Sequence, residues 1–273
     1  MTHHTEAHDP KNVVQSLAKG FRVLEAFSAL DPELTLAEAA RRAGLDNATA
    51  FRLLNTLVML GYVIRIDGTR RFRLSLKSLD LGFNAIARME LRDLARPVLR
   101  SLVGSVNEAA SLGVLEGGHV VYVERVQAGL TRLGVDVRIG STVPAWYSAI
   151  GHALLAWLPA REQKRVLELL PRVKLTPATL TAIPDILRQL AKIRHAGWAL
   201  SDQDVVPGLR VLAAPVLDRD GRPVAAVSVA APSLRMPLPQ FQKLATAPLL
   251  DATQTIARAL EAKGTIQNAP VAA

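Results

Sequence analysis

The chain has 273 residues, a formal net charge of +9 and 49% hydrophobic residues, but only 4% aromatic residues and no cysteine. This length suggests about two domains. The missing cysteines exclude disulfides, thiolate catalysis and cysteine-based zinc sites. The excess of positive charge favours a polyanionic partner such as nucleic acid.

Residues 1–12 are polar, with three histidines, and we expect them to form a disordered tail. No secretory signal is visible. Residues 139–160 lack a formal charge, but Pro144, Gly151 and several hydroxyl side chains make this stretch too polar and too broken to span a membrane. We therefore expect a cytoplasmic protein that does not contact a membrane.

A first helix is predicted over residues 13–30, because Val14, Leu17, Phe21, Leu24 and Phe27 recur at helical spacing. It would pack behind two short helices that follow. The first of these, residues 36–43, turns Leu36, Ala39 and Ala40 inward. Gly44 then allows the left-handed conformation that a sharp turn between helices usually needs.

The next helix begins after Asp46 or Asn47, either of which suits an N-cap. Its apolar side is predicted to be buried and comprises Ala50, Leu53, Leu54, Leu57, Val58 and Gly61. Its opposite side carries Ala48, Arg52 and Asn55, with Thr49 and Thr56 beside them. Small residues allow a close approach to a DNA major groove, and Arg and Asn side chains read guanine and adenine edges. This side is therefore a predicted recognition surface.

A hairpin with a basic tip follows directly. Residues 63–66 and 72–76 alternate as strands do, and Asp67-Gly68 between them is a strong signal for a tight turn. Positions 41 to 77 hold eight basic residues against two acidic ones. A solvated basic face is the alternative, but charge, helix pair and hairpin coincide here as DNA binding requires. We predict DNA contacts from Thr35, Asn47, Ala48, Thr49, Arg52, Asn55, Arg65, Arg70, Arg71 and Arg73.

The rest of the chain predicts an α+β domain. Residues 79–90 read as a linker helix, and residues 91–106 as a helix with Pro97 inside it. Two hairpins are expected, at Gly117-Gly118 and at Arg219-Asp220-Gly221, and residues 131–139 alternate as a further strand. Helices are predicted over residues 148–158, 161–170, 179–195 and 239–263.

Three segments carry a resemblance to a known family. TLAEAARRAGLDNATAFRLLNTLVMLGYV with RRFRLS, then GSTVPAWYSAIGHALLA, then GWALSDQDVVPGLRVLAAPV occur in the order and at the spacing of the IclR family of bacterial transcription regulators. The chain resembles this family over nearly its whole length, to about residue 263. DQDVVPGLR resembles the branch that senses aromatic and β-keto acids of the protocatechuate and 4-hydroxybenzoate pathways.

The resemblance implies a winged helix-turn-helix over residues 13–78, a linker helix over 79–90 and a GAF-like effector-binding domain over 91–264, with a second tail over 265–273. The linker helix would pair two DNA-binding domains, so a homodimer, or a tetramer built from two dimers, is expected. The other partners would be double-stranded operator DNA and a small carboxylic acid effector.

The segment around residue 148 offers parts of a pocket for such an acid. The N–H groups of Ala149 and Ile150 at a helix start would bind a carboxylate after Ser148. Trp146 and Tyr147 would form the walls of the pocket around an aromatic ring. The alternative is that Trp146 belongs to the core and Tyr147 lies on the surface. Arg132 would pair with the carboxylate as a fork or lie at the rim in solvent.

Family pocket positions carried onto this sequence are Val143, Ala149, Ile150, Ser201, Leu209, Val211, Ser228 and Ala230. Ser201 stands where the family often has an acid, and Ala230 where it often has a hydroxyl. A less polar pocket agrees with an aromatic acid such as 4-hydroxybenzoate or protocatechuate. A non-aromatic acid of the glyoxylate, pyruvate or β-ketoadipate type is the alternative. We expect Asp202 and Asp204 to hold their loop, for instance through Arg210.

Two other classes of protein fit the sequence less well. An enzyme with a DNA-binding appendage would need a catalytic motif, but the sequence has no nucleophile motif, no phosphate loop and no histidine pair at metal spacing. A purely architectural DNA-binding protein leaves the second domain without a role. We therefore expect a transcription regulator with no catalytic residue, no cofactor and no metal.

Overall fold

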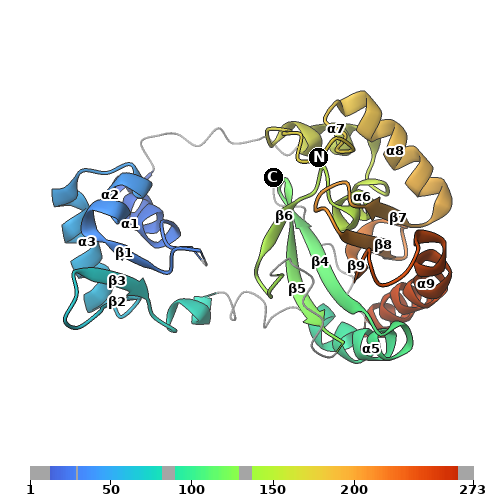
Figure 1. Cartoon of the computed structure of the whole chain (residues 1–273), viewed down its shortest axis with the longest axis horizontal. Coiled ribbons are helices and arrows are strands. Elements are labelled where there is room, and N and C mark those ends of the chain that lie inside the picture. Colours follow the sequence, from blue (N-terminus) through green and yellow to red (C-terminus); the bar gives the residue numbers. More distant parts are fainter. Residues whose placement is uncertain (1–12, 29, 82–89, 129–136, 264–273) are drawn as a thin grey trace. The chain divides into compact units, whose positions relative to one another are not determined.

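The computed structural model describes residues 13–28, 30–81, 90–128 and 137–263 (Figure 1). These residues form two compact units, 13–81 and 90–263. Among the described residues, no helix is long and apolar enough to cross a membrane. Residues 1–12 and 264–273, most of the predicted linker helix and Arg132 lie outside the described ranges.

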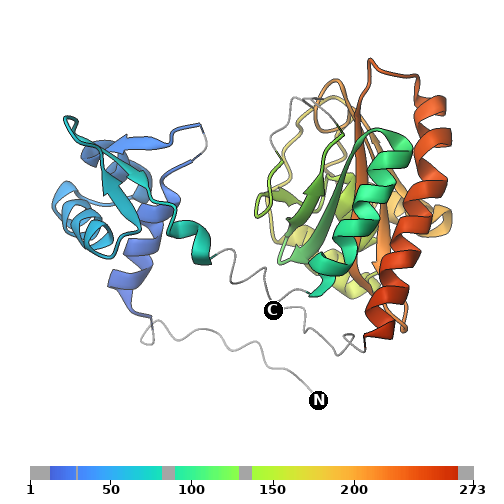
Figure 2. The same ribbon diagram turned by 90° about the horizontal axis from the view of Figure 1, so that it is seen from below.

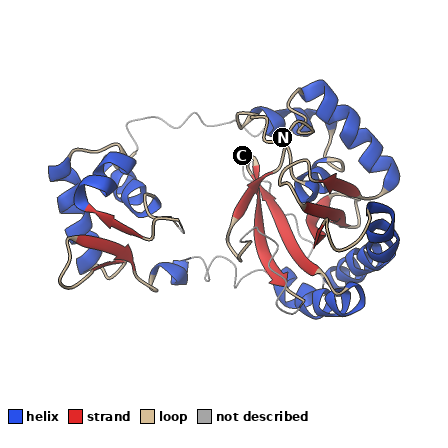
Figure 3. Cartoon of the chain, in the orientation of Figure 1, coloured by secondary structure: helices blue, strands red, loops and turns tan. Residues whose placement is uncertain are grey.

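The first unit combines helices with a small sheet, and residues 78–81 form a further short helical segment after the last strand (Figure 3). Its elements are α1 (Gln15–Glu25), β1 (Glu33–Thr35), α2 (Leu36–Ala43), α3 (Asn47–Met59), β2 (Val63–Arg65) and β3 (Arg71–Leu74). The strands are antiparallel in the order β1-β3-β2. The helix pair and the hairpin are as predicted. The prediction missed β1, which is three residues long and carries little strand signal of its own.

The first helix differs from its prediction in length and in its buried side. It ends at Glu25 rather than near residue 30. Val14, Leu17 and Phe21 are 63%, 61% and 48% exposed, whereas Val23 and Phe27 enter the core with α2 and α3. The helix packs against α2 and α3 as predicted, and Leu24 and Phe27 of the predicted stripe take part in the core. The earlier part of the stripe, Val14, Leu17 and Phe21, faces outward instead.

The second unit is a six-stranded antiparallel sheet with helices on both faces. Its elements are α5 (Glu90–Val106), β4 (Ala109–Glu116), β5 (His119–Val126), β6 (Thr142–Pro144), α6 (Ala149–Leu155), α7 (Ala160–Glu168), α8 (Ile183–Ala196), β7 (Ala199–Asp202), β8 (Leu209–Leu217), β9 (Pro223–Pro232) and α9 (Leu238–Ala262). The strand order is β6-β5-β4-β9-β8-β7. This arrangement confirms the predicted α+β class and both hairpins.

Each face of the sheet has its own core. Helices α5 and α9 lie side by side on one face (Figure 2) and bury an apolar cluster with alternate residues of β4, β8 and β9, among them Leu112, Leu212 and Val227. On the other face, α6 and α8 cover Val120, Ala213 and Ala226. Successive side chains of a strand point to opposite faces of the sheet, so the same strands contribute residues to both cores.

Several elements of the second unit differ from the prediction. Of the strand predicted over 131–139, residues 137–139 are not a strand and the rest lie outside the described ranges. The helix predicted from Thr179 begins at Ile183, where Pro184 in the first turn suits a helix start. Strands β6 and β7 were missed; they are three and four residues long and form the two edges of the sheet.

Gly151 fixes how closely the loop before α6 approaches that helix. A Cβ added at Gly151 would lie 2.3 Å from the carbonyl oxygen of Ala145. That oxygen belongs to the backbone and has no side-chain freedom with which to withdraw. Only glycine therefore fits at this position of α6.

We expect Gly151→Ala to lower the free energy of unfolding of the second unit by about 1–3 kcal/mol, the usual cost of an inserted methyl group without space. Denaturant unfolding followed by circular dichroism measures this. Gly104→Ala is the matched control, because Gly104 is helical and a Cβ there meets nothing within 4 Å. Equal stability of the two variants would contradict the close approach.

Candidate nucleic-acid interface and ligand site

Hydrogen bonds at both helix starts fix the turn between α2 and α3. The Thr35 hydroxyl accepts a bond from the Glu38 N–H at 3.3 Å, and a Glu38 carboxylate oxygen accepts one from the Thr35 N–H at 2.8 Å. These bonds form a capping box and lower the pKa of Glu38. Gly44 has the expected left-handed conformation, with φ at +63°. Asp46 is the N-cap of α3 and accepts from the Thr49 N–H at 2.8 Å.

Helix α3 turns the predicted recognition side outward. Ala50, Leu54 and Leu57 are buried on its inner side. Ala48 and Arg52 are exposed, and Asn55 is half-buried. Asn47 is exposed and Thr49 half-buried in the first turn. An exposed arginine one turn from an amide side chain presents the groups that read base edges in a major groove.

Asn55 and Arg65 join the helix to the hairpin. A guanidinium N–H of Arg65 donates to the Asn55 Oδ1 at 3.1 Å. The Arg65 guanidinium carbon also lies 5.2 Å from the centroid of the Phe72 ring, close enough for a cation–π contact. The hairpin therefore sits in a fixed place beside α3, and the Asn55 amide is already oriented.

The hairpin presents arginines on its exposed side. Arg71 and Arg73 alternate with buried Phe72, and Arg70 lies exposed in the turn. Arg71 also donates to the Glu33 carbonyl at 3.1 Å and lies 3.6 Å from a Glu38 carboxylate oxygen. Thr35, in the cap of α2, pairs with Arg71 across the strands. Thr35 and Arg71 thus have structural roles besides the predicted contact with phosphates.

The second unit gathers most predicted ligand residues on one face of its sheet. Ser201, Val211 and Ala230 are cross-strand neighbours on β7, β8 and β9. Ser228 lies in the next row, opposite Ala213. Leu209 precedes Val211 by two residues and shares its face. Val143 reaches the same face from β6, where it pairs with Val120.

The loop between β6 and α6 is held from within. The Ser148 hydroxyl donates to the Pro144 carbonyl at 3.0 Å and accepts from the Gly151 N–H at 3.2 Å. His152 is buried, which lowers its pKa and keeps it neutral, and its Nε2 donates to the Trp146 carbonyl at 2.8 Å. These bonds fix the segment that carries Trp146 and Tyr147.

Trp146 and Tyr147 have different environments. Trp146 is 3% exposed and belongs to the core beneath α6, as the alternative had it. Tyr147 is half-buried, and its ring meets that of Trp146 edge-on at 4.8 Å. Ala149 and Ile150 are buried in the first turn of α6, which is only seven residues long. A carboxylate at their N–H groups stays a prediction.

A bulge in the pairing of β4 with β5 brings two further polar residues to this face. The register shifts between Leu112 and Gly113, so that Leu112 faces Glu124 and Gly113 faces Tyr122. Tyr122 packs into the core under α6, and Arg125 donates to the Ser111 hydroxyl at 2.9 Å. The sequence predicted neither residue, because positions three apart on a regular strand point to opposite faces.

Glu124 points to the other face, between these two residues. It is 2% exposed and accepts from the Arg92 Nε at 3.0 Å, with Arg96 at 3.9 Å. Both arginines belong to α5. The other Glu124 oxygen accepts from the Arg125 N–H at 3.0 Å. The Glu124-Arg125 pair therefore connects the ligand-side face to the start of α5.

Asp202 holds the loop between β7 and β8 through Arg210, as predicted. The Arg210 Nε donates to the Asp202 carboxylate at 2.6 Å. The Asp204 carbonyl accepts from the hydroxyls of Thr176 and Thr179 at 2.8 and 2.7 Å. Burial raises the pKa of the Asp204 carboxyl. Both aspartates thus hold the loop that borders Ser201, although Asp204 does so through its backbone.

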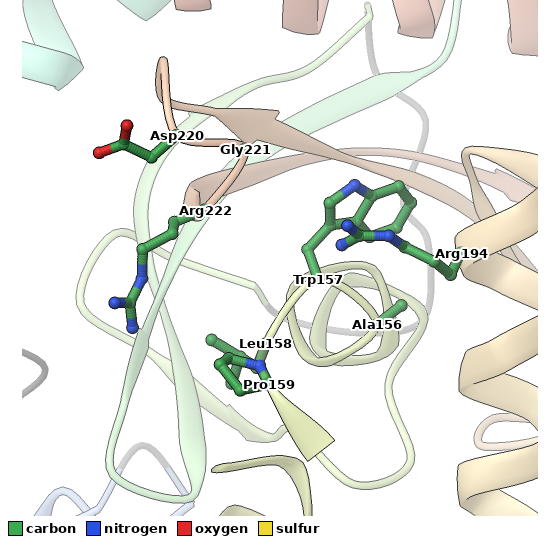
Figure 4. Close-up of a pocket in the computed structure, with 8 residues that line it drawn as sticks. All are labelled: Ala156, Trp157, Leu158, Pro159, Arg194, Asp220, Gly221 and Arg222. Carbon is green, nitrogen blue, oxygen red and sulfur yellow. The ribbon is translucent and has the colours of Figure 1, made fainter. Parts of the chain in front are cut away.

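A cavity of about 420 Å³ lies away from the predicted ligand residues. Its walls come from the end of α6, the turn between β8 and β9, and α8. Figure 4 shows the Trp157 ring beside the Arg194 guanidinium, with Asp220 and Arg222 on the opposite wall. Arg194 lies 5.1 Å from the Trp157 ring centroid. None of the predicted effector residues lines this cavity.

Both units of the chain match the two domains of one known protein family. Residues 16–66 match the IclR helix-turn-helix domain, and residues 83–258 match the bacterial transcriptional regulator IclR C-terminal domain. The Pca regulon regulatory protein of Pseudomonas putida is 32% identical over 81% of this chain and 75% of its own. The regulator KdgR of Escherichia coli is 31% identical over 84% of this chain and 87% of its own. These identities favour no one branch of the family.

A solved structure is similar over both units as well. An IclR homolog from Microbacterium hydrocarbonoxydans, crystallised with 4-hydroxybenzoate, is 26% identical and superposes with a TM-score of 0.76. The match covers 90% of this chain and 99% of that one. The fold of the chain is thus that of a regulator observed with an aromatic acid.

We expect Arg52→Ala to weaken binding to the intergenic DNA beside the protein's own gene by about 1–3 kcal/mol, and binding to random DNA by much less. The reason is that an arginine that reads bases loses sequence-specific contacts. Fluorescence anisotropy at fixed salt measures both affinities. Arg100→Ala, which removes an equal charge from the exposed side of α5, serves as control. Equal losses on both DNAs would contradict base reading by Arg52.

Proposed function

The chain belongs to the IclR family of bacterial transcriptional regulators, and we propose that it controls catabolic genes in response to a small carboxylic acid. The observation that carries this proposal is the surface formed by α3 and the hairpin. Arg52 is exposed there, Asn55 is held in place by Arg65, and further arginines follow along β3. No catalytic role is assigned to either unit.

An aromatic acid such as 4-hydroxybenzoate or protocatechuate is the effector we propose. The sheet face beneath α6 supports it, because Ser201, Val211 and Ala230 are cross-strand neighbours there and offer a small, mostly apolar surface. The similarity to an IclR homolog crystallised with 4-hydroxybenzoate is a second support. A non-aromatic acid of the glyoxylate, pyruvate or β-ketoadipate type is the alternative, because the identities to relatives favour no one branch of the family.

A homodimer is the proposed assembly. The exposed stripe of Val14, Leu17 and Phe21 on α1 lies on a helix that otherwise packs against α2 and α3. Exposed apolar side chains that adjoin one another on a helix are typical of an interface. A second copy of the chain would bury the stripe and place two recognition helices about 34 Å apart, one DNA turn.

Leu17→Glu should therefore convert dimer to monomer at micromolar concentration in sedimentation velocity, because a carboxylate cannot be buried against an apolar partner without a large cost. Leu234→Glu is the control, since Leu234 is 97% exposed but lies in the second unit. An unchanged dimer for Leu17→Glu would exclude α1 from the interface.

The effector proposal predicts coupling between acid and DNA. We expect 4-hydroxybenzoate or protocatechuate to change the affinity for the intergenic DNA by ten-fold or more, about 1.4 kcal/mol of coupling. Pyruvate tests the alternative. A ligand shifts the affinity only if it binds the two states of the protein unequally. Tight DNA binding that none of these acids alters would leave the DNA-binding role intact and refute the effector class.

A further inference from the structure

A row of polar side chains crosses the sheet face beneath α6. Arg125 on β5, Ser111 on β4 and Ser228 on β9 are successive cross-strand neighbours. Both serines are nearly buried, at 2% and 4% exposure. The next residue of the row is Ala213, which belongs to the apolar core under α6. Polar groups on a buried face carry a cost unless they have a partner, which makes this row a candidate for ligand contacts.

Two tyrosines lie near the charged end of this row. Tyr122 packs on the same side as Arg125 because of the bulge, and Tyr147 comes from the loop before α6. Burial raises the pKa of Tyr122 to about 12, although the charge of Arg125 opposes this rise. Burial also raises the pKa of Tyr147. Both phenols are therefore protonated at neutral pH and have a proton to donate.

The groups at this end form a set suited to an anion. A guanidinium carries five N–H donors in a planar fork that matches a carboxylate, and the Arg125–Ser111 bond sets the direction of the fork. Tyr122 lies close enough to Arg125 to interact with its charge, and close enough to Tyr147 to interact with that phenol. Both tyrosines pack against the apolar core under α6, and in apolar surroundings a charged hydrogen bond is stronger than in water.

The start of α6 is less suited to the same task. The Ser148 hydroxyl already accepts a hydrogen bond from the Gly151 N–H, and the helix is only seven residues long. Ala149 and Ile150 carry no charge, and Ile150 packs close to Gly113 of β4. The start of α6 therefore offers only the partial charges of its N–H groups, whereas Arg125 offers the N–H donors of a guanidinium.

We propose that Arg125 binds the carboxylate of the effector, with Ser111, Tyr122 and Tyr147 as the neighbouring polar contacts. This inference rests on the proposed function and makes it more specific: the effector is a small monocarboxylate whose acid group lies over β4 and β5. Its apolar part extends along the face toward Val211 and Ala230.

The test is isothermal titration of the full-length protein with 4-hydroxybenzoate, its uncharged amide 4-hydroxybenzamide, and pyruvate. The wild type should bind at least one of the two acids, and should bind 4-hydroxybenzoate, if that is the effector, at least ten-fold more tightly than the amide. Arg125→Met should weaken binding of the acid about 10- to 100-fold, as expected for a lost charged hydrogen bond. Arg125→Lys, which keeps the charge without the fork, should fall between.

Arg100→Met is the matched control, because Arg100 is exposed on α5. It should bind the acid as the wild type does. Melting temperature and affinity for the intergenic DNA without ligand establish that Arg125→Met is folded. Should it fail to fold, the acid and amide are compared on the wild type and on Ser111→Ala, which should bind the acid more weakly.

Three outcomes would overturn the inference. The first is an unchanged acid affinity in Arg125→Met, and the second is equal binding of acid and amide by the wild type. The third is that neither acid binds the wild type. The DNA measurement separates these from failure of the proposed function. If the acid still changes DNA affinity in Arg125→Met as it does in the wild type, the regulator stands and Arg125 is not its anchor.

Discussion

The second unit depends on the packing of α5 and α9 against one face of a six-stranded sheet. This contact buries alternate residues of β4, β8 and β9 in an apolar core, and Glu124 on the same face is paired with Arg92 of α5. Because successive residues of a strand point to opposite faces, the same strands must supply the other face as well. That second face lies under α6 and α8, and it is where the buried serines gather. The face under α5 and α9 is thus mainly apolar, whereas the face under α6 and α8 is mixed.

The dipeptide Glu124-Arg125 joins the two faces. Glu124 pairs with Arg92 at the start of α5, whereas Arg125 turns to Ser111 on the opposite side. The Arg125 N–H donates to Glu124, so a continuous set of bonds runs from one face to the other. Helix α5 is the first element of the second unit. These bonds therefore join the ligand-side face to the segment of the second unit that is closest in sequence to the DNA-binding unit.

In the first unit, several side chains of the predicted DNA-binding surface also contact one another. Thr35 caps α2 and pairs with Arg71 of the hairpin, and Asn55 of α3 is held by Arg65. Side chains expected to meet DNA thus also orient one another in the free protein. An oriented recognition surface loses less conformational freedom when it binds than a mobile one. The exposed stripe on α1 is a separate surface, on a helix whose other side belongs to the core.

The sequence alone determined the elements that local signals specify. The helix pair around Gly44, the cap at Asp46, and the hairpins at Asp67-Gly68, Gly117-Gly118 and Asp220-Gly221 follow from residues within a few positions of one another. The exposed side of α3 and the α+β class followed from periodicity. Such signals act over one helical turn or one strand pair and do not depend on distant contacts.

Only the tertiary structure decided where the local pattern misleads about the buried side. Val14, Leu17 and Phe21 have the spacing of a buried face and yet lie outside, whereas Phe27 of the same predicted stripe is in the core. The edge strands β6 and β7 are too short to be recognised and exist through their pairing with β5 and β8. The bulge in β5 places Tyr122 and Arg125 on one face, against the alternation that the sequence suggests. A register shift is set by the partner strand, and the partner lies outside any local window of sequence.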